Sequence, residues 1–342
     1  MTFRRVLNVL TLVLVVGLLI ALRHELVQAW NLLSKVNIWI LLLIVPLQFL
    51  SYYANGAAIF SYLKKRGHMQ KVKNWDMARM ALELNFVNHI LPTAGVSGVS
   101  YMTWRLNKLG VSSGRATLAQ VVRLAASFGS FVVLLVLAVF IVTIDSGVNR
   151  VAILATSGLT SALIIGGMIV WYIIDSEVRL SKFSEQVSRA VNWFGRVVMR
   201  SKRKLLSPAR IKKFLDELQD DYRALKADPR LLIRPFLWGV VFNLTEVSLF
   251  FFTFLSLGSF VNPATILLAI GVAAVVGAVM VTPGGTGGYE AFMVLILTTS
   301  GVPGATALAG VLLARVILVL LTIGSGYIFY HLALRTYGKH PA

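Results

Sequence analysis

Six long, nearly uncharged apolar runs constrain the fold of this chain more than any other feature. A helical run of about 20 apolar residues matches the ~30 Å hydrocarbon core of a bilayer. With 57% hydrophobic and 14% charged residues, the 342-residue chain is too apolar for a soluble domain. The sequence therefore predicts an all-α integral membrane protein, a single polytopic domain over 1–342. We expect about six transmembrane helices, near 6–22, 37–63, 116–144, 151–174, 231–257 and 304–332.

Two further apolar segments, 76–109 and 263–299, are interrupted by proline and glycine. The interruptions contain Pro92, Gly95 and Gly98 in the first segment, and Pro283, Gly284, Gly285, Gly287 and Gly288 in the second. Each proline precedes a Gly-Val pair at the same spacing (110 − 92 and 301 − 283 are both 18). Breaks at matching positions in two halves of a chain are typical of a membrane transporter's binding site.

These interrupted segments are better explained as re-entrant hairpins than as pairs of complete spans. The limb after Gly288 has about a dozen residues before the next glycine, so a helix there reaches roughly 18 Å of a ~30 Å core. The first limb of the other hairpin carries polar side chains that are costly to place in lipid: Asp76, Arg79, Glu83, Asn85, Asn88 and His89. We therefore expect both hairpin tips to lie within the membrane, against protein or water.

Lysine and arginine concentrate in alternate loops, which predicts an orientation. The excess marks the cytoplasmic side of a multi-pass protein, so it accounts for the net charge of +19 without a nucleic-acid partner. It places both termini on the cytoplasmic side of a cell inner (plasma) membrane. It also predicts that the two hairpins enter the membrane from opposite sides. We expect a first repeat over 36–175, a basic amphipathic cytoplasmic insert over 176–230, and an inverted second repeat over 231–335. The insert either attracts anionic lipid or is a solvated linker.

Candidate binding groups gather around the hairpin tips. Free N–H groups at helix N-termini attract phosphate or carboxylate, and lone intramembrane arginines face a partner or a polar pathway. The candidate partners of Arg123 and Arg315 are Glu83, Glu246, Glu290 or the phosphate of a lipid. The alternative is that glycine and proline only permit close helix packing. Glu290 is either a helix cap or a coupling residue, and Glu246 is a candidate proton relay. The candidate substrate-binding residues are Asn85, Asn88, Pro92, Gly95, Gly98, Arg105, Arg123, Glu246, Pro283, Gly284, Gly285, Gly287, Gly288, Glu290 and Arg315.

The sequence contains no recognisable catalytic constellation. It has no cysteine, no phosphate-binding loop, no nucleophile elbow and no histidine-rich metal spacing. Its carboxylates are scattered over different segments. We therefore expect no enzymatic activity, no cofactor and no metal. A membrane-embedded transferase acting on lipid phosphates, with Arg123 and Arg315 as anion clamps, is the minority alternative.

The segment 283–290, followed by Gly301-Val302 and Arg315, is similar to the signature of the lysylphosphatidylglycerol synthase transmembrane (flippase-like) family. Residues 88–123 resemble that family's earlier motif. In many members an acidic residue follows the glycine of this earlier motif, but Gly95 to Gly98 contains none. Most of a chain of this length is taken up by membrane segments, so no synthase domain fits in it. The resemblance therefore implies that the chain does not itself make aminoacylated lipid.

The resemblance implies a lipid translocase. Its cargo would be an anionic or aminoacylated phospholipid or a lipid-linked sugar, passing through a polar cavity between opposed hairpin tips. The implied partners are that lipid and anionic lipid at the cytoplasmic face, with a homodimer and a separate lipid-modifying enzyme as further candidates. Two alternatives stay open: a small-anion transporter or channel, and a membrane scaffold that transports nothing.

Overall fold

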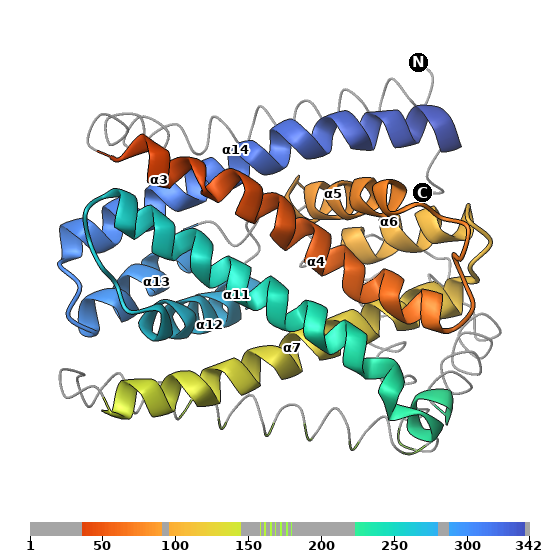
Figure 1. Ribbon diagram of the computed structural model, residues 1–342, viewed down its shortest axis with the longest axis horizontal. Coiled ribbons are helices and arrows are strands. Elements are labelled where there is room, and N and C mark those ends of the chain that lie inside the picture. The colour runs from red at the N-terminus through yellow and green to blue at the C-terminus, as the bar shows by residue number, and fades with distance from the viewer. Residues whose placement is uncertain are drawn as a thin grey trace, which may run out of the picture.

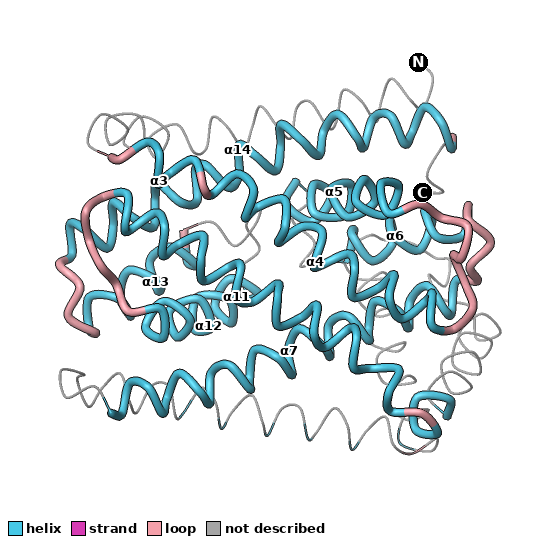
Figure 2. The backbone as a smooth tube through the Cα atoms, in the orientation of Figure 1, coloured by secondary structure: helices cyan, strands magenta, loops and turns pink. Residues whose placement is uncertain are grey.

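The computed structural model describes residues 36–90, 96–144, 223–279 and 287–338, with a few isolated positions between 158 and 179. The four long segments consist of helices joined by short turns (Figures 1 and 2). Among them, four helical stretches are long and apolar enough to cross a membrane: Ile38–Lys65, Ser113–Ala138, Pro229–Ser256 and Gly304–Tyr337. These coincide with four of the six predicted spans. The spans predicted at 6–22 and 151–174, and most of the insert at 176–230, lie outside the described residues.

Two long helices cross the centre of the molecule. Helix α4 (Ile44–Lys65) and helix α11 (Ile233–Ser256) pack side by side and run in opposite directions (Figure 1). The short helix α3 (Ile38–Leu42) precedes α4. The break between them falls one turn before Pro46, which has no N–H to donate to the Leu42 carbonyl. The predicted span at 37–63 is thus a helix with an interrupted first turn.

Two more long helices lie along opposite edges of the molecule. Helix α7 (Ser113–Ile144) follows one edge and helix α14 (Gly304–Tyr337) follows the other (Figure 1). They also run in opposite directions, as the colour gradient shows. The short 3-10 helix η1 (Pro229–Leu232) leads into α11, and its N-cap Asp228 accepts the Arg230 N–H. The Asp-Pro sequence at 228–229 therefore begins this span, as the sequence indicates.

Two shorter helical pairs fill the opposite ends of the molecule. Helices α5 (Asn74–Ile90) and α6 (Val96–Asn107) form one pair, and α12 (Pro263–Val279) and α13 (Gly288–Thr299) form the other (Figures 1 and 2). In both pairs the limbs have 17 and 12 residues. Each pair is joined to its flanking long helices at one end of the molecule, and the two pairs use opposite ends (Figure 1). Their tips, at 91–95 and 280–286, lie outside the described residues.

Four helix ends match in pairs at a spacing of 191 residues. The helices α4 and α11 end before Gly67 and Gly258, and α6 and α13 end before Gly110 and Gly301 (258 − 67 and 301 − 110 are both 191). All four glycines have φ between 75° and 95°. In each turn, the N–H after the glycine bonds to the carbonyl five residues earlier, as in a Schellman cap. Both Gly-Val pairs seen in the sequence are therefore helix caps of the same kind.

The two halves interlock through their short helices. Helix α5 packs against α14 from the other half, and α12 packs against α7 in the same reciprocal way. Glycines set the close approach of α5 to α14 and to its own neighbour α4. A Cβ added at Gly326 of α14 would lie 2.4 Å from Cβ of Phe86 on α5, and one at Gly56 of α4 would lie 2.6 Å from Cβ of Ala81. Glycine-mediated packing therefore does occur here, within helices outside the predicted breaks.

Candidate functional site

One face of α4 carries buried polar side chains at helical spacing: Gln48, Ser51, Tyr52 and Asn55. Each of the last three bonds to a different helix. The Ser51 hydroxyl donates to Oε1 of Glu246 on α11 at 2.6 Å, and the Tyr52 hydroxyl bonds to that of Thr322 on α14. Polar groups inside a membrane helix need such internal partners, because lipid offers none. The polar face of α4 therefore organises the centre of the molecule.

Arg123 of α7 reaches the same face of α4. Its Nη1 donates to Oδ1 of Asn55 at 2.6 Å, and the amide nitrogen of Asn55 donates to Oδ1 of Asn85 on α5 at 3.0 Å. Only 9% of Arg123 is exposed, and its Nε has no hydrogen-bond partner among the described residues. No carboxylate in this part of the chain pairs with it. A buried guanidinium held by one neutral amide is costly, and an anion would relieve that cost.

Arg315 of α14 has a different environment, because Glu290 of α13 neutralises it. The Arg315 Nε lies 2.7 Å from Oε1 of Glu290, with the two side chains 14% and 8% exposed. The other carboxylate oxygen, Oε2, accepts the Gly287 N–H at 2.7 Å, and the guanidinium carbon lies 4.5 Å from the ring centre of Tyr289. Glu290 is therefore both the cap of α13 and the ionic partner of Arg315, and its coupling role stays a prediction.

Further polar groups lie between the two arginines. The protonated Nδ1 of His89 donates to the Asn85 carbonyl at 2.8 Å, because a carbonyl can only accept. His89 and Glu246 both lie within electrostatic range of Arg315. Hydrogen bonds thus run from Arg123 across α4 to α5, and Arg315 lies within electrostatic range of the end of this network. It brings together Asn85, Arg123, Glu246, Glu290 and Arg315 of the predicted site.

Arg105 lies in a separate cluster. Its Nε donates to Oε2 of Glu83 at 3.1 Å, and the same oxygen accepts the Tyr101 hydroxyl at 2.9 Å. The ring of Tyr337 at the end of α14 covers the guanidinium at 3.7 Å. Arg105 and Glu83 are 4% and 2% exposed, so the pair is fully internal. This arrangement fixes α6 against α5 and α14, and Glu83 is thereby occupied rather than paired with Arg123.

Asn88 and Gly98 face each other next to the first tip. A Cβ at Gly98 would lie 1.9 Å from Oδ1 of Asn88, and that oxygen is buried without a hydrogen-bond partner in the described structure. Gly287 has φ 91° and precedes Gly288, the first residue of α13. The remaining predicted site residues lie outside the described residues: Pro92, Gly95, Pro283, Gly284 and Gly285.

The polar face of α4 was missed by the sequence analysis, which treated 37–63 as a plain span. A signal was present: Gln48, Ser51 and Asn55 recur at three- and four-residue spacing in an otherwise apolar segment. That spacing puts them on one face of a helix. Residues of this kind inside a membrane helix face protein or water.

The described side chains suit the binding of an anion better than that of a metal. Within the described ranges, no group of three or more histidine, aspartate or glutamate side chains converges closely enough to hold a metal ion. The cationic groups are one arginine neutralised by Glu290 and one, Arg123, that has only an amide partner. Arg123 is therefore the candidate anion ligand of this network.

Comparison with known proteins agrees with a membrane protein whose function is related to lipid. No curated protein sequence matches the chain. A family described as lysylphosphatidylglycerol synthase TM region matches residues 6–326, which include both helical pairs, three of the four membrane-length stretches and most of the fourth. This match implies a multi-pass membrane protein with a function related to membrane lipid. The chain belongs to the lysylphosphatidylglycerol synthase transmembrane-region family.

Proposed function

We propose that this protein is a lipid translocase that carries a phosphate-bearing headgroup between the two leaflets. The cargo is an anionic or aminoacylated phospholipid or a lipid-linked sugar. The observation that carries the proposal is the buried guanidinium of Arg123, which has one neutral partner and a free Nε in the described part of the chain. A lipid phosphate supplies the missing negative charge and accepts from that Nε. Moving a headgroup breaks no covalent bond, so the proposal requires no enzymatic activity.

A difference between the two halves supports binding at Arg123. At the 191-residue spacing, the position that corresponds to Glu290 is Val99 (290 − 191 = 99), which has no charge. Gln120, one turn before Arg123, donates to the Val99 carbonyl at 3.1 Å, so the first turn of α6 lies beside this part of α7. That turn contains no acidic residue, whereas the first turn of α13 contains Glu290. Among its described residues, the first half thus has a helix N-terminus without an acidic residue and an arginine without a carboxylate, and both favour an anion.

The proposed architecture has six spans and two re-entrant hairpins, α5–α6 and α12–α13, arranged as an inverted repeat. Limbs of 17 and 12 residues reach roughly 26 and 18 Å, short of a ~30 Å core. The antiparallel directions of α4 and α11 and the opposite ends used by the two pairs support the inversion (Figure 1). We propose that the halves rock against each other to alternate access, with both termini in the cytoplasm of the inner membrane and Glu246 as a candidate for proton coupling.

The translocation assay follows a fluorescent lipid in proteoliposomes. The purified chain is reconstituted with headgroup-matched labelled phosphatidylglycerol, lysyl-phosphatidylglycerol, phosphatidylethanolamine or a lipid-linked sugar. Label on the outer leaflet is then quenched chemically over time. We expect Arg123→Ala to slow translocation of the cargo about 10- to 100-fold, because a hydrogen bond to a charged group is worth about 1.5–3 kcal/mol. Arg123→Lys should retain part of the rate, since it keeps the charge but loses the planar donor fork.

Arg115→Ala is the matched control, because Arg115 lies on the same helix but is exposed. Equal rates for Arg123→Ala and Arg115→Ala would contradict the role of Arg123. Transport of free phosphate or chloride without any lipid movement would indicate an anion transporter. Absence of all transport in a folded, reconstituted chain would indicate a scaffold.

The inverted layout is testable with single cysteines, because the chain has none of its own. We expect Gln70→Cys, in the turn before α5, and Phe260→Cys, in the turn before α12, to react with a membrane-impermeant maleimide from opposite sides of the membrane. Both positions are exposed. Thr93→Cys, in the first tip, distinguishes a re-entrant hairpin from two full spans. Labelling of Thr93→Cys from the side opposite Gln70→Cys would show that the pair crosses completely.

A further inference from the structure

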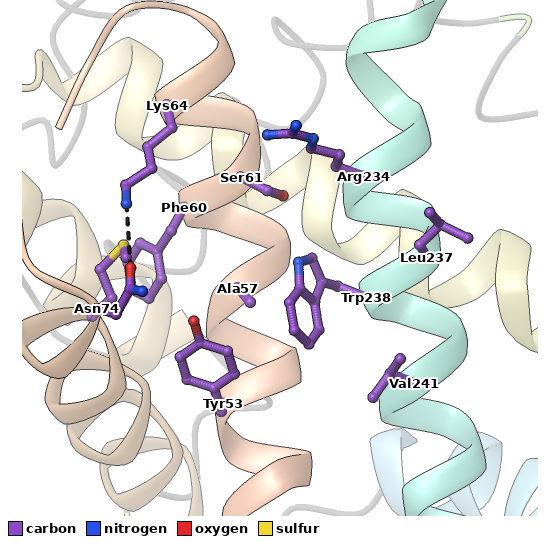
Figure 3. Close-up of a pocket in the computed structure, with 11 residues that line it drawn as sticks. Tyr53, Ala57, Phe60, Ser61, Lys64, Asn74, Arg234, Leu237, Trp238 and Val241 are labelled. Carbon is purple, nitrogen blue, oxygen red and sulfur yellow. Dashed lines mark hydrogen bonds between the residues drawn. The ribbon is translucent and has the colours of Figure 1, made fainter. Parts of the chain in front are cut away.

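A cavity of about 480 Å³ lies between α4 and α11, apart from the network described above (Figure 3). It opens where α4 ends and α11 begins, and the first turn of α5 closes its third side. Its volume lies within the range of small-molecule sites, which is about 300–1,000 Å³. It has room for a headgroup and glycerol but not for two acyl chains, so any lipid bound there keeps its chains in the bilayer.

Two cationic side chains from different helices line this cavity. Arg234 extends from α11 across the gap toward Ser61 of α4, and Lys64 bends from α4 toward Asn74 of α5 (Figure 3). The Lys64 Nζ donates to Oδ1 of Asn74 at 3.4 Å, a long bond to a neutral group. No aspartate or glutamate is among the described residues that line the cavity. The cavity therefore combines two positive side chains with no negative one, which favours an anion.

Aromatic and apolar side chains also line the cavity. Tyr53 and Trp238 meet edge to face across the gap, with ring centres 5.4 Å apart at 81°. Leu237 lines the cavity and is itself 56% exposed, so the cavity continues into an apolar surface on α11. Positive groups next to an exposed apolar edge match an amphipathic molecule better than a free ion. The match is to a lipid whose phosphate sits between the cations.

The positions that correspond to these charges in the internal repeat are apolar. At the 191-residue spacing, Lys64 corresponds to Leu255 and Arg234 to Leu43 (64 + 191 and 234 − 191). Trp238 corresponds likewise to Leu47. The charged positions thus lie at one end of the α4–α11 pair, and the corresponding positions at the other end are apolar. The lysine and arginine excess predicts that this charged end is the cytoplasmic one, so an anionic headgroup that binds there comes from the cytoplasmic leaflet.

We propose that the cavity between α4 and α11 binds one anionic glycerophospholipid, with its headgroup phosphate held between Lys64 and Arg234 and its chains leaving past Leu237 into the leaflet. The guanidinium of Arg234 suits two phosphate oxygens, and the Lys64 ammonium adds a point charge. The Ser61 hydroxyl completes the polar side. This proposal concerns binding alone and does not depend on translocation by the Arg123 network.

The experiment measures lipid binding to the purified full chain in neutral detergent by native mass spectrometry. The probes are phosphatidylglycerol, phosphatidylcholine, and glycerol phosphate as a chain-free source of the same phosphate. We expect phosphatidylglycerol to bind and the Lys64→Gln/Arg234→Gln double variant to weaken it about tenfold or more. The matched control is Lys71→Gln/Lys73→Gln, which removes the same charge from exposed positions outside the lining. That control should bind within about twofold of the unmodified chain.

A second variant keeps both cations and fills the space between the helices. Ser61→Trp should lower phosphatidylglycerol affinity as strongly as the double variant, while its thermal unfolding shows whether the chain is folded. Equal affinity of the double variant and its control would overturn the proposal. So would equal binding of phosphatidylcholine, or binding of glycerol phosphate as tight as that of the lipid. A folded Ser61→Trp chain that still binds the lipid would place the lipid elsewhere.

Discussion

Arg315→Ala is expected to lower the stability of the protein by about 3–5 kcal/mol, the usual cost of removing one partner from a buried ion pair. The substitution leaves Glu290 buried with only the Gly287 N–H as a partner. It also removes the cation that lies within electrostatic range of Glu246. The carboxylates of Glu290 and Glu246 would then both lack a compensating charge. The measurement is thermal or denaturant unfolding of the purified chain in detergent.

Glu290→Ala should be less damaging than Arg315→Ala. Although it removes the cap of α13, it leaves Arg315 close to Glu246, which is positioned to take over part of the charge compensation. The double variant should be less unstable than the sum of the single ones, because it leaves no unpaired member of the bond. Arg335→Ala, on the same helix but exposed, is the control and should change stability little. Strict additivity would show that the pair is not coupled.

Gly310→Leu is expected to have the second largest effect. A Cβ at Gly310 of α14 would lie 2.1 Å from Cε1 of Phe254 on α11, and Phe254 is fully buried. Overpacking of this kind typically costs about 1–3 kcal/mol, and the additional atoms of leucine raise it further by forcing the two long helices apart. Gly310→Ala should show the lower end of this range. The measurement is the unfolding temperature in detergent, followed by translocation at a temperature where the variant is folded.

Gly324→Ala provides the matched control on the same helix. A Cβ there meets nothing within 4 Å, so the change should be neutral or stabilise the helix by about 1 kcal/mol. Combining Gly310→Ala with Phe254→Leu should restore part of the lost stability, because the smaller side chain makes room. If Gly310→Ala and Gly324→Ala behaved alike, the close contact between α14 and α11 would not govern stability.

The sequence predicted well what depends on local pattern. Four membrane-length helices appear where the apolar runs lie, and the Gly-Val pairs at 110–111 and 301–302 end helices in the same way. A glycine with φ near +80° in a cap, or a run of about 20 apolar residues, is recognisable without knowing its neighbours. The matched breaks likewise indicated two related halves. The 191-residue spacing of the helix caps then defines which positions of the two halves correspond.

Contacts between distant segments were predicted only in part. The sequence offered Glu83, Glu246 and Glu290 as partners of two arginines, and the structure pairs Glu290 with Arg315 but Glu83 with Arg105. The reason is geometric. Which carboxylate meets which guanidinium depends on the faces that α5, α6, α13 and α14 turn toward each other, and those faces are set by packing at small residues.

The sequence by itself determined that this chain is an all-helical membrane protein with two similarly punctuated halves, because hydrophobicity, charge and glycine act over a few residues. Only the tertiary structure placed Asn55 against Arg123, left that arginine without a carboxylate among the described residues, and opened a cationic cavity between Lys64 and Arg234. Lys64 and Arg234 are 170 positions apart (234 − 64). Their meeting depends on two helices packing in one register, which no local pattern encodes.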